Sequence, residues 1–139
     1  MCEKLLTNSI HLAAKSGNEY GWYLSDLEQV RNEAIFNGLA CLGGQVQFCG
    51  KWGTAEAYWL SSDPSPQKSD ESIDGYVKRS WDDFMKDVFS IQTNQYTDAA
   101  KSFKCLEGVA CDWDIEAIWI IYFSNTAAEQ GDSERAPLR

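Results

Sequence analysis

The residues of this chain that could do chemistry are few, and their spacing does not bring them together. The single histidine, His11, has no second histidine or carboxylate at the spacing of a metal site or an acid–base pair. Asp82 and Asp83 are adjacent, but neighbouring residues of a helix point more than a quarter turn apart, so they cannot both line one small site. Gly43-Gly44 lacks the lysine and the Ser/Thr of a phosphate-binding loop. We therefore expect no catalytic residue, no metal and no cofactor.

The cysteines also give no sign of a reactive or metal-binding site. They form an odd set of five without a CxxC pair, which is typical neither of a zinc site nor of a disulfide framework. Cys41 and Cys49 flank a predicted strand, where we expect them to behave as small hydrophobic residues. A reducing cytoplasm is the expected compartment. The full set is Cys2, Cys41, Cys49, Cys105 and Cys111.

The remaining candidates are tryptophans close to acidic residues. The chain has six tryptophans, and several lie in predicted turns or at predicted strand ends. Aromatic anchors rimmed by carboxylates are typical of a surface that binds a basic partner. The predicted partner-binding residues are Trp52, Trp59, Asp63, Asp70, Glu71 and Asp74, with Asp112, Trp113 and Asp114 as an alternative patch.

The net charge of −9 favours the same class of partner. A chain with this charge repels a polyanion, so direct binding of DNA or RNA is disfavoured. The same field attracts a basic protein and raises its encounter rate. The longest apolar run, residues 117–123, is far too short to span a bilayer, so no membrane association is expected.

The elements that must position these residues follow from periodicity. Helices are predicted over Cys2–Ser16, where Gly17 would end the helix, and from Ser25 to Gly38, where Ser25 and Glu28 fit a capping box. Period-two alternation predicts a strand over 40–48, and after a turn at 49–53 the chain returns as a strand over 54–60. Gly43-Gly44 within the first strand predicts a bulge or a close approach of another backbone.

The second half of the chain gives the clearest helix, over residues 70–91. A shorter helix is predicted over 97–106, and residues 115–123 read as a strand buried on both faces. Trp81 and Trp119 are assigned to the core. The expected fold class is α+β: a small antiparallel or mixed sheet with a hairpin and a central C-terminal strand, covered by two to four helices. Residues 1–126 form the single domain, and 127–139 are expected to be a polar, disordered tail.

Several short phrases within roughly residues 20–90 carry a family resemblance. In this order and setting they resemble small bacterial immunity proteins of polymorphic toxin and contact-dependent growth inhibition systems. The phrases are Gly21-Trp22, a helix with Leu27 and Ala34, the run Gly38-Leu39-Ala40-Cys41-Leu42-Gly43-Gly44-Gln45-Val46, Tyr58-Trp59, an acidic loop with Pro64, and Tyr76-Val77-Lys78-Arg79-Ser80-Trp81.

The resemblance implies a non-catalytic cytoplasmic antidote. Such a protein binds a cognate toxin domain, often a nuclease, and occludes its active site or substrate groove. Two other classes stay open from the residues themselves. A small-ligand or carbohydrate-binding domain would also display Trp and Asp at strand ends, and an enzyme would have to use the cysteines or the paired carboxylates.

Overall fold

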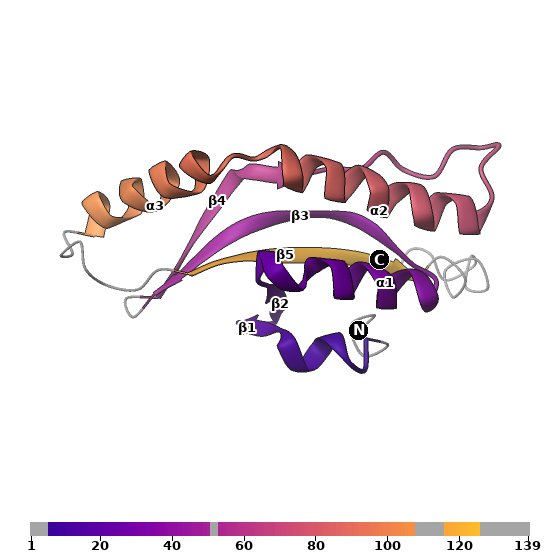
Figure 1. The fold of residues 1–139 in the computed structure, drawn as a ribbon, viewed down its shortest axis with the longest axis horizontal. Helices are drawn as coiled ribbons and strands as arrows, with labels where there is room; N and C mark the ends of the chain where they lie inside the picture. The colour runs from indigo at the N-terminus through magenta and orange to yellow at the C-terminus, as the bar shows by residue number, and fades with distance from the viewer. Residues whose placement is uncertain (1–5, 51–52, 108–115, 126–139) are drawn as a thin grey trace.

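The structure is a computed structural model that describes residues 6–50, 53–107 and 116–125. The predicted tail 127–139, together with Cys2 and Cys111, lies outside these residues. The described residues form five strands, three α-helices and two short 3₁₀ turns, arranged as in Figure 1. In chain order the elements are η2 Ser9–Leu12, β1 Ala14–Ser16, β2 Glu19–Trp22, η3 Leu24–Asp26, α1 Leu27–Phe36, β3 Leu39–Gly50, β4 Gly53–Ser62, α2 Ile73–Ser90, α3 Thr93–Glu107 and β5 Glu116–Asn125.

The strands form one sheet in the order β1-β2-β5-β3-β4, and all neighbouring pairs are antiparallel. The predicted α+β class, the β3–β4 hairpin and the central position of the C-terminal strand are confirmed. β2 and β3 both pair with β5, so they are parallel, and α1 connects them; α2 and α3 connect β4 to β5 in the same way. Two crossovers of the same hand put their helices on the same face of the sheet. In Figure 1 the strands descend from β4 to β1, with α1 in front of β5.

The hydrophobic core lies between these helices and one face of the sheet. Along β5, Trp119, Ile121 and Phe123 belong to the core shared with the helices. Ile118 and Ile120 alternate with them and point to the opposite face, where they are also buried. The prediction that this strand is buried on both faces is confirmed for these positions.

Trp81 and Trp119 are buried, as predicted. Phe84 of α2 lies edge-on to both indoles, with ring centroids 5.5 Å from each. The indole Nε1 of Trp81 also donates a 2.8 Å hydrogen bond to the carbonyl oxygen of Leu39. Ring packing and a buried hydrogen bond therefore fix α2 against the start of β3.

Gly43-Gly44 lies at a bulge, as predicted. The register between β3 and β5 shifts between Cys41 and Gly43, and Gly43 has φ +138°, which side chains rarely adopt. A Cβ atom on Gly44 would lie 2.6 Å from the carbonyl oxygen of Ile120. One on Gly43 would lie 2.7 Å from the carbonyl oxygen of Ser62. Both glycines are therefore required by the close approach of neighbouring backbone.

The predicted N-terminal helix over Cys2–Ser16 is wrong in its described part. The chain forms the short turn η2 and then β1, which pairs with β2 through a two-residue connection, Gly17-Asn18. Gly17 has φ +61°, and glycine with positive φ is the usual first residue of one type of two-residue hairpin turn. The glycine interpreted as the end of a helix is therefore the turn of a hairpin, because glycine marks both features.

The start of α1 also differs from the prediction. Ser25 lies inside the turn η3, α1 begins at Leu27, and no side chain caps it. The capping box of Ser25 and Glu28 is therefore wrong, because the 3₁₀ turn makes Asp26, and not Ser25, the residue that precedes the helix. The predicted stop at Gly38 fits, since the helix ends at Phe36 and Gly38 has φ +71°.

The long predicted helix is confirmed as α2, and its cap is identified. The hydroxyl oxygen of Ser72 accepts a 3.0 Å hydrogen bond from the backbone amide of Gly75. α3 begins at Thr93, four residues before the predicted Thr97. Within the described ranges, the helices are all too short or too polar to cross a membrane.

Candidate functional site

The sequence candidates fall into one group that the structure places and one that it does not. Trp52 and the alternative patch of Asp112, Trp113 and Asp114 lie outside the described residues. Trp59, Asp63, Asp70, Glu71 and Asp74 are placed, all on β4, on the loop after it or on the first turn of α2.

Trp59 is exposed at a bulge in the edge strand β4. The register between β3 and β4 shifts between Gln45 and Val46, so that residues 58–60 have no opposite partner in β3. Trp59 is 52% exposed and its neighbour Tyr58 is 71% exposed. Their rings meet edge to face, with centroids 5.3 Å apart. The bulge therefore presents two large aromatic side chains together at the surface.

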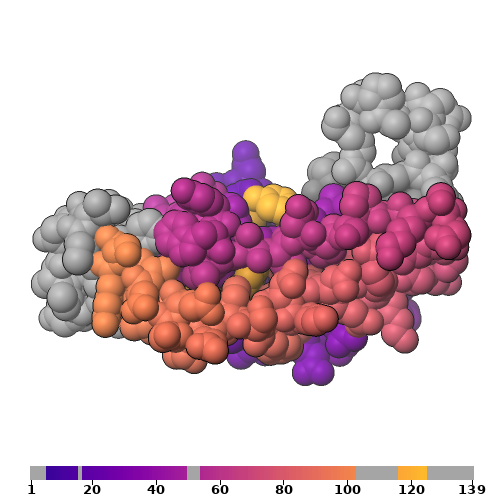
Figure 2. All heavy atoms as spheres, turned by 90° about the horizontal axis from the view of Figure 1, so that it is seen from above, coloured from indigo at the N-terminus to yellow at the C-terminus, as the bar shows by residue number. Residues whose placement is uncertain are grey.

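Tyr58 was not among the candidates predicted from the sequence. Regular alternation along a strand would put one of two consecutive residues inside and the other outside. The bulge exposes both, and the dipeptide Tyr58-Trp59 within a predicted edge strand was the available signal. Figure 2 looks onto this edge of the sheet and shows β4 at the surface beside α2 and α3.

The three predicted aspartates are exposed, but they do not form one patch. Asp63 follows Ser62, whose hydroxyl donates a 2.7 Å hydrogen bond to Asp87 near the end of α2. Asp74 lies in the first turn of the same helix, and Asp70 precedes it. At 1.5 Å per residue, Asp74 and Asp87 are separated by about 20 Å along the helix axis. Asp63 therefore lies at the end of the bulged strand β4 and near the end of α2, while Asp70 and Asp74 lie at the other end of α2.

Glu71 is engaged inside the molecule. Its two carboxylate oxygens accept hydrogen bonds from the guanidinium of Arg79 at 2.8 and 2.9 Å. Arg79 also donates to the carbonyl oxygens of Ser65 and Pro66, at 2.9 and 3.0 Å. Arg79 thus holds both ends of the 63–72 loop against α2, and Glu71 orients the guanidinium. We assign Glu71 a role in positioning the loop.

Glu71 makes the protein sensitive to acid. The hydrogen bonds from Arg79, with a further one from the Lys68 amide, lower the pKa of Glu71 to about 2 from its ordinary 4.5. Because the folded state prefers the ionised form, the stabilisation is fully present above the ordinary pKa and is lost as the pH falls toward 2.

We therefore expect Glu71→Gln to lower the urea midpoint at pH 7, and the gap to the wild type to narrow between pH 5 and pH 2.5. Asp70→Asn, at the exposed neighbouring acid, is the control and should leave the midpoint nearly unchanged at each pH. A gap for Glu71→Gln that stays constant over this range would contradict an ionised Glu71–Arg79 pair.

Of the groups considered for catalysis, those that the structure describes do not converge. Within the described ranges, no three His, Cys, Asp or Glu side chains lie together as a metal site. Asp82 pairs with Arg31 at 2.9 Å and Asp83 with Arg79 at 3.3 Å, so the two carboxylates point to different partners, as predicted. Burial raises the pKa of Cys41, which disfavours a nucleophilic thiolate at neutral pH.

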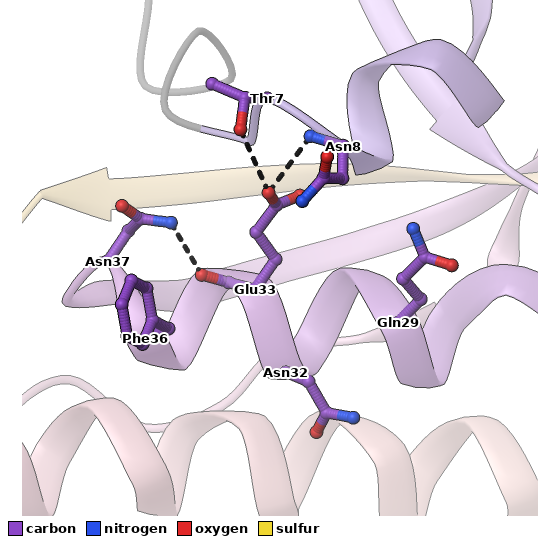
Figure 3. Close-up of a pocket in the computed structure, with 7 residues that line it drawn as sticks. All are labelled: Thr7, Asn8, Gln29, Asn32, Glu33, Phe36 and Asn37. Carbon is purple, nitrogen blue, oxygen red and sulfur yellow. Dashed lines mark hydrogen bonds between the residues drawn. The ribbon is translucent and has the colours of Figure 1, made fainter.

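A second feature is an open hollow of about 630 Å³ beside α1, shown in Figure 3. Phe36 at its rim is 88% exposed. Glu33 accepts hydrogen bonds from the amides of Asn8 and Ser9 at 3.0 and 2.7 Å, which ties the N-terminal segment to α1. Partial burial opposes ionisation of Glu33, but these amides outweigh it and lower its pKa. The lining residues are Thr7, Asn8, Gln29, Asn32, Glu33, Phe36 and Asn37.

Comparison with protein-family models, with curated proteins and with solved structures finds no match to this chain. Its function has to be inferred from its own surface. The two candidate binding sites on the described surface are the Tyr58–Trp59 bulge and the amide-rich hollow beside Phe36, and the protein that carries them is acidic.

Proposed function

We propose that this protein is a non-catalytic immunity protein that binds a cognate bacterial toxin domain and neutralises it by covering its active site or substrate groove. The observation that carries the proposal is the exposed Tyr58–Trp59 pair on the bulge of an edge strand. Large aromatic side chains that are rigidly presented at a surface are the usual energetic anchors of protein interfaces. The resemblance of residues 20–90 to immunity proteins supports the same function.

The charge of the protein supports a basic partner. With a net charge of −9, the protein would be steered toward a toxin that carries a positive groove, as a nuclease does. Carboxylates of the antidote would then occupy the positions of the substrate phosphates. Asp63, which directly follows the bulged strand, is the predicted acid best placed to join the aromatic pair, with Asp70 and Asp74 about one helix length away. The proposed site of action is the bacterial cytoplasm.

Co-expression with the C-terminal domain encoded immediately upstream in the genome tests the proposal. A stable one-to-one complex, together with rescue of growth from the toxin, is the expected result. Mixing the purified proteins should also abolish the activity of the toxin at equimolar ratio, since occlusion is stoichiometric. Copurification without rescue, or rescue without a complex, would contradict neutralisation by binding.

The hollow beside Phe36 favours a second candidate function, the binding of a neutral polar ligand such as a carbohydrate. Side-chain amides and an exposed ring are the groups that hydrogen-bond sugar hydroxyls and stack on sugar faces. Calorimetric titration with a glycan panel tests this function, with Phe36→Ala as the matched variant. Saturable binding that Phe36→Ala abolishes would favour it, and the absence of heat with every glycan would remove it.

A further inference from the structure

The face of the sheet opposite the α-helices has an unusual charge. We call it the outer face and define it by the alternation of β5: Glu116, Ile118, Ile120 and Tyr122 point there, away from the core residues Trp119, Ile121 and Phe123. The strand register adds neighbours from the other strands to the same face. Those added residues are Glu19, Gly21, Tyr23, Gln45, Gln47 and Glu56.

On strands β2 to β5, acidic residues are not balanced by basic ones; Lys15 of β1 lies opposite Tyr20, on the helical side of the sheet. β2, β3, β4 and β5 carry three glutamates, Glu19, Glu56 and Glu116, and no lysine or arginine. Of the described carboxylates, those paired with arginine are Glu71, Asp82 and Asp83, which lie on α2 or just before it. The helical side is therefore partly neutralised by ion pairs, whereas the outer face keeps its negative charge.

Each of the three glutamates is held in place by a neutral donor. The Tyr122 hydroxyl donates to Glu19 at 2.7 Å, and the Tyr23 hydroxyl donates to Glu116 at 3.1 Å. The Gln45 amide donates to Glu56 at 2.8 Å. A neutral donor fixes the direction of a carboxylate without cancelling its charge.

The tyrosines remain donors at physiological pH. Burial, together with the hydrogen bond to Glu19, raises the pKa of Tyr122 to about 12. The hydrogen bond to Glu116, followed by burial, raises the pKa of Tyr23. The charge of Glu56 also contributes to raising the pKa of Tyr122.

Gln47 gives an independent sign that this face meets a hydrogen-bond donor. It lies opposite Glu56 in the β3–β4 register and is 4% exposed. Among the described residues, its side-chain oxygen Oε1 has no hydrogen-bond partner. A buried amide oxygen left unpaired is unfavourable. An N–H donor on a docked partner could satisfy it after a small rotation of the amide.

The outer face is large enough for a protein partner; its centre, at Ile118, Ile120 and Gln47, is buried, so a partner would meet the acids and tyrosines around that centre. From β2 to β4 there are three strand spacings, about 14 Å, and from Tyr122 to Glu116 the strand rises about 20 Å. The exposed Tyr58 lies two residues beyond Glu56 on β4, so the aromatic bulge borders this face. The acidic patch alone is smaller than half of a standard interface, and the bulge extends it.

We propose that the outer face of the sheet is the docking surface for a basic protein partner, whose Lys and Arg side chains meet Glu19, Glu56 and Glu116 while Tyr58 and Trp59 anchor the edge. The identity of the partner rests on the proposed function: it is the toxin domain. The inference locates the contact on the sheet, which differs from the predicted aspartates of the 63–72 loop and α2.

Two matched pairs of substitutions test the location. Glu56→Gln with Glu116→Gln removes two charges from the outer face, and both new amides can still accept the hydrogen bonds from Gln45 and Tyr23. The control is Glu28→Gln with Asp98→Asn, which removes two exposed charges from α1 and α3. Both variants change the net charge equally, so a difference between them reports position alone.

The measurement is the association rate with the toxin domain by stopped flow, at about 10 mM and about 500 mM salt. We expect the outer-face variant to associate about tenfold more slowly at low salt, and the control to change by less than about twofold. At high salt the two should be nearly equal. Wild-type binding with equal rates for both variants would overturn the location and leave the proposed function intact.

A second probe separates the two proposals if the toxin domain does not bind the wild type, which would remove the proposed function. Hexa-arginine is then titrated into ¹⁵N-labelled protein at low salt. Shifts confined to the amides around Glu19, Glu56 and Glu116, and lost in the outer-face variant, would support basic docking there. Shifts spread over the helices, or the same shifts in that variant, would overturn it.

Discussion

Replacing Trp59 with alanine is expected to weaken binding of the proposed toxin partner by at least about 30-fold, mainly through faster dissociation. Truncation of an aromatic hot spot typically costs 2 kcal/mol or more, and 1.4 kcal/mol corresponds to a factor of ten in affinity. Trp59 packs edge to face against Tyr58, so its ring is already ordered before the partner arrives. Ordering that is complete before binding lowers the entropic cost of association.

The same substitution should leave the fold intact, because about half of the Trp59 side chain is in water. Phe89 is the matched control: it is also a large aromatic residue, 68% exposed, but it lies on the helix α2 and not on the bulged strand. Dissociation rates by surface plasmon resonance and melting temperatures by calorimetry would be measured for Trp59→Ala and Phe89→Ala. Equal effects of the two on dissociation would show that the bulge is not the anchor.

The β3–β4 hairpin and α2 could be predicted because each depends on local patterns. The apolar spacing of α2 gives one buried stripe whatever it packs against. Gly43-Gly44 indicates close backbone contact even though the sequence does not show which backbone approaches. For these elements, residues within one segment carry enough information.

The N-terminal region could not be predicted in this way. β1 has three residues, too few to show a period of two, and its partner β2 has four. Gly17 is equally suited to a helix end and to a hairpin turn, and pairing of β2 with β5 from the far end of the chain decides between them. That contact is between distant residues, so no local pattern reveals it.

Only part of the candidate site could be predicted, because the rest depends on contacts between distant residues. The exposure of Trp59 and of the aspartates could be predicted from residue type and from their position in or near loops. Tyr58 is exposed only because β4 bulges against β3. The role of Glu71 cannot be seen in the sequence, because its partner Arg79 is eight residues later in the chain, on α2. The outer face needs the order and register of four strands, since its three glutamates come from β2, β4 and β5.

Trp81→Ala is expected to destabilise the protein by about 3–5 kcal/mol, the range for removing a fully buried tryptophan or phenylalanine. The indole is fully buried, and its ring contacts Phe84 and Phe123 at centroid distances of 5.5 and 5.9 Å. Its loss also leaves the carbonyl of Leu39 without its donor. A domain of this size has a total stability of about 5–15 kcal/mol, so the variant would lose a large share of it.

Trp81→Phe separates the two contributions. It keeps most of the aromatic volume but removes the N–H donor, so its cost should be smaller, about 1–3 kcal/mol for an unpaired buried carbonyl. Equilibrium unfolding in urea of both variants, with Trp59→Ala as the exposed tryptophan for comparison, measures the difference. A cost below about 1 kcal/mol for Trp81→Ala would mean that α2 does not pack on the sheet through this residue. We expect the loss of unfolding free energy to be largest for Trp81→Ala, smaller for Trp81→Phe and smallest for Trp59→Ala. Trp81 joins α2 to the start of β3, whereas about half of Trp59 is exposed to solvent.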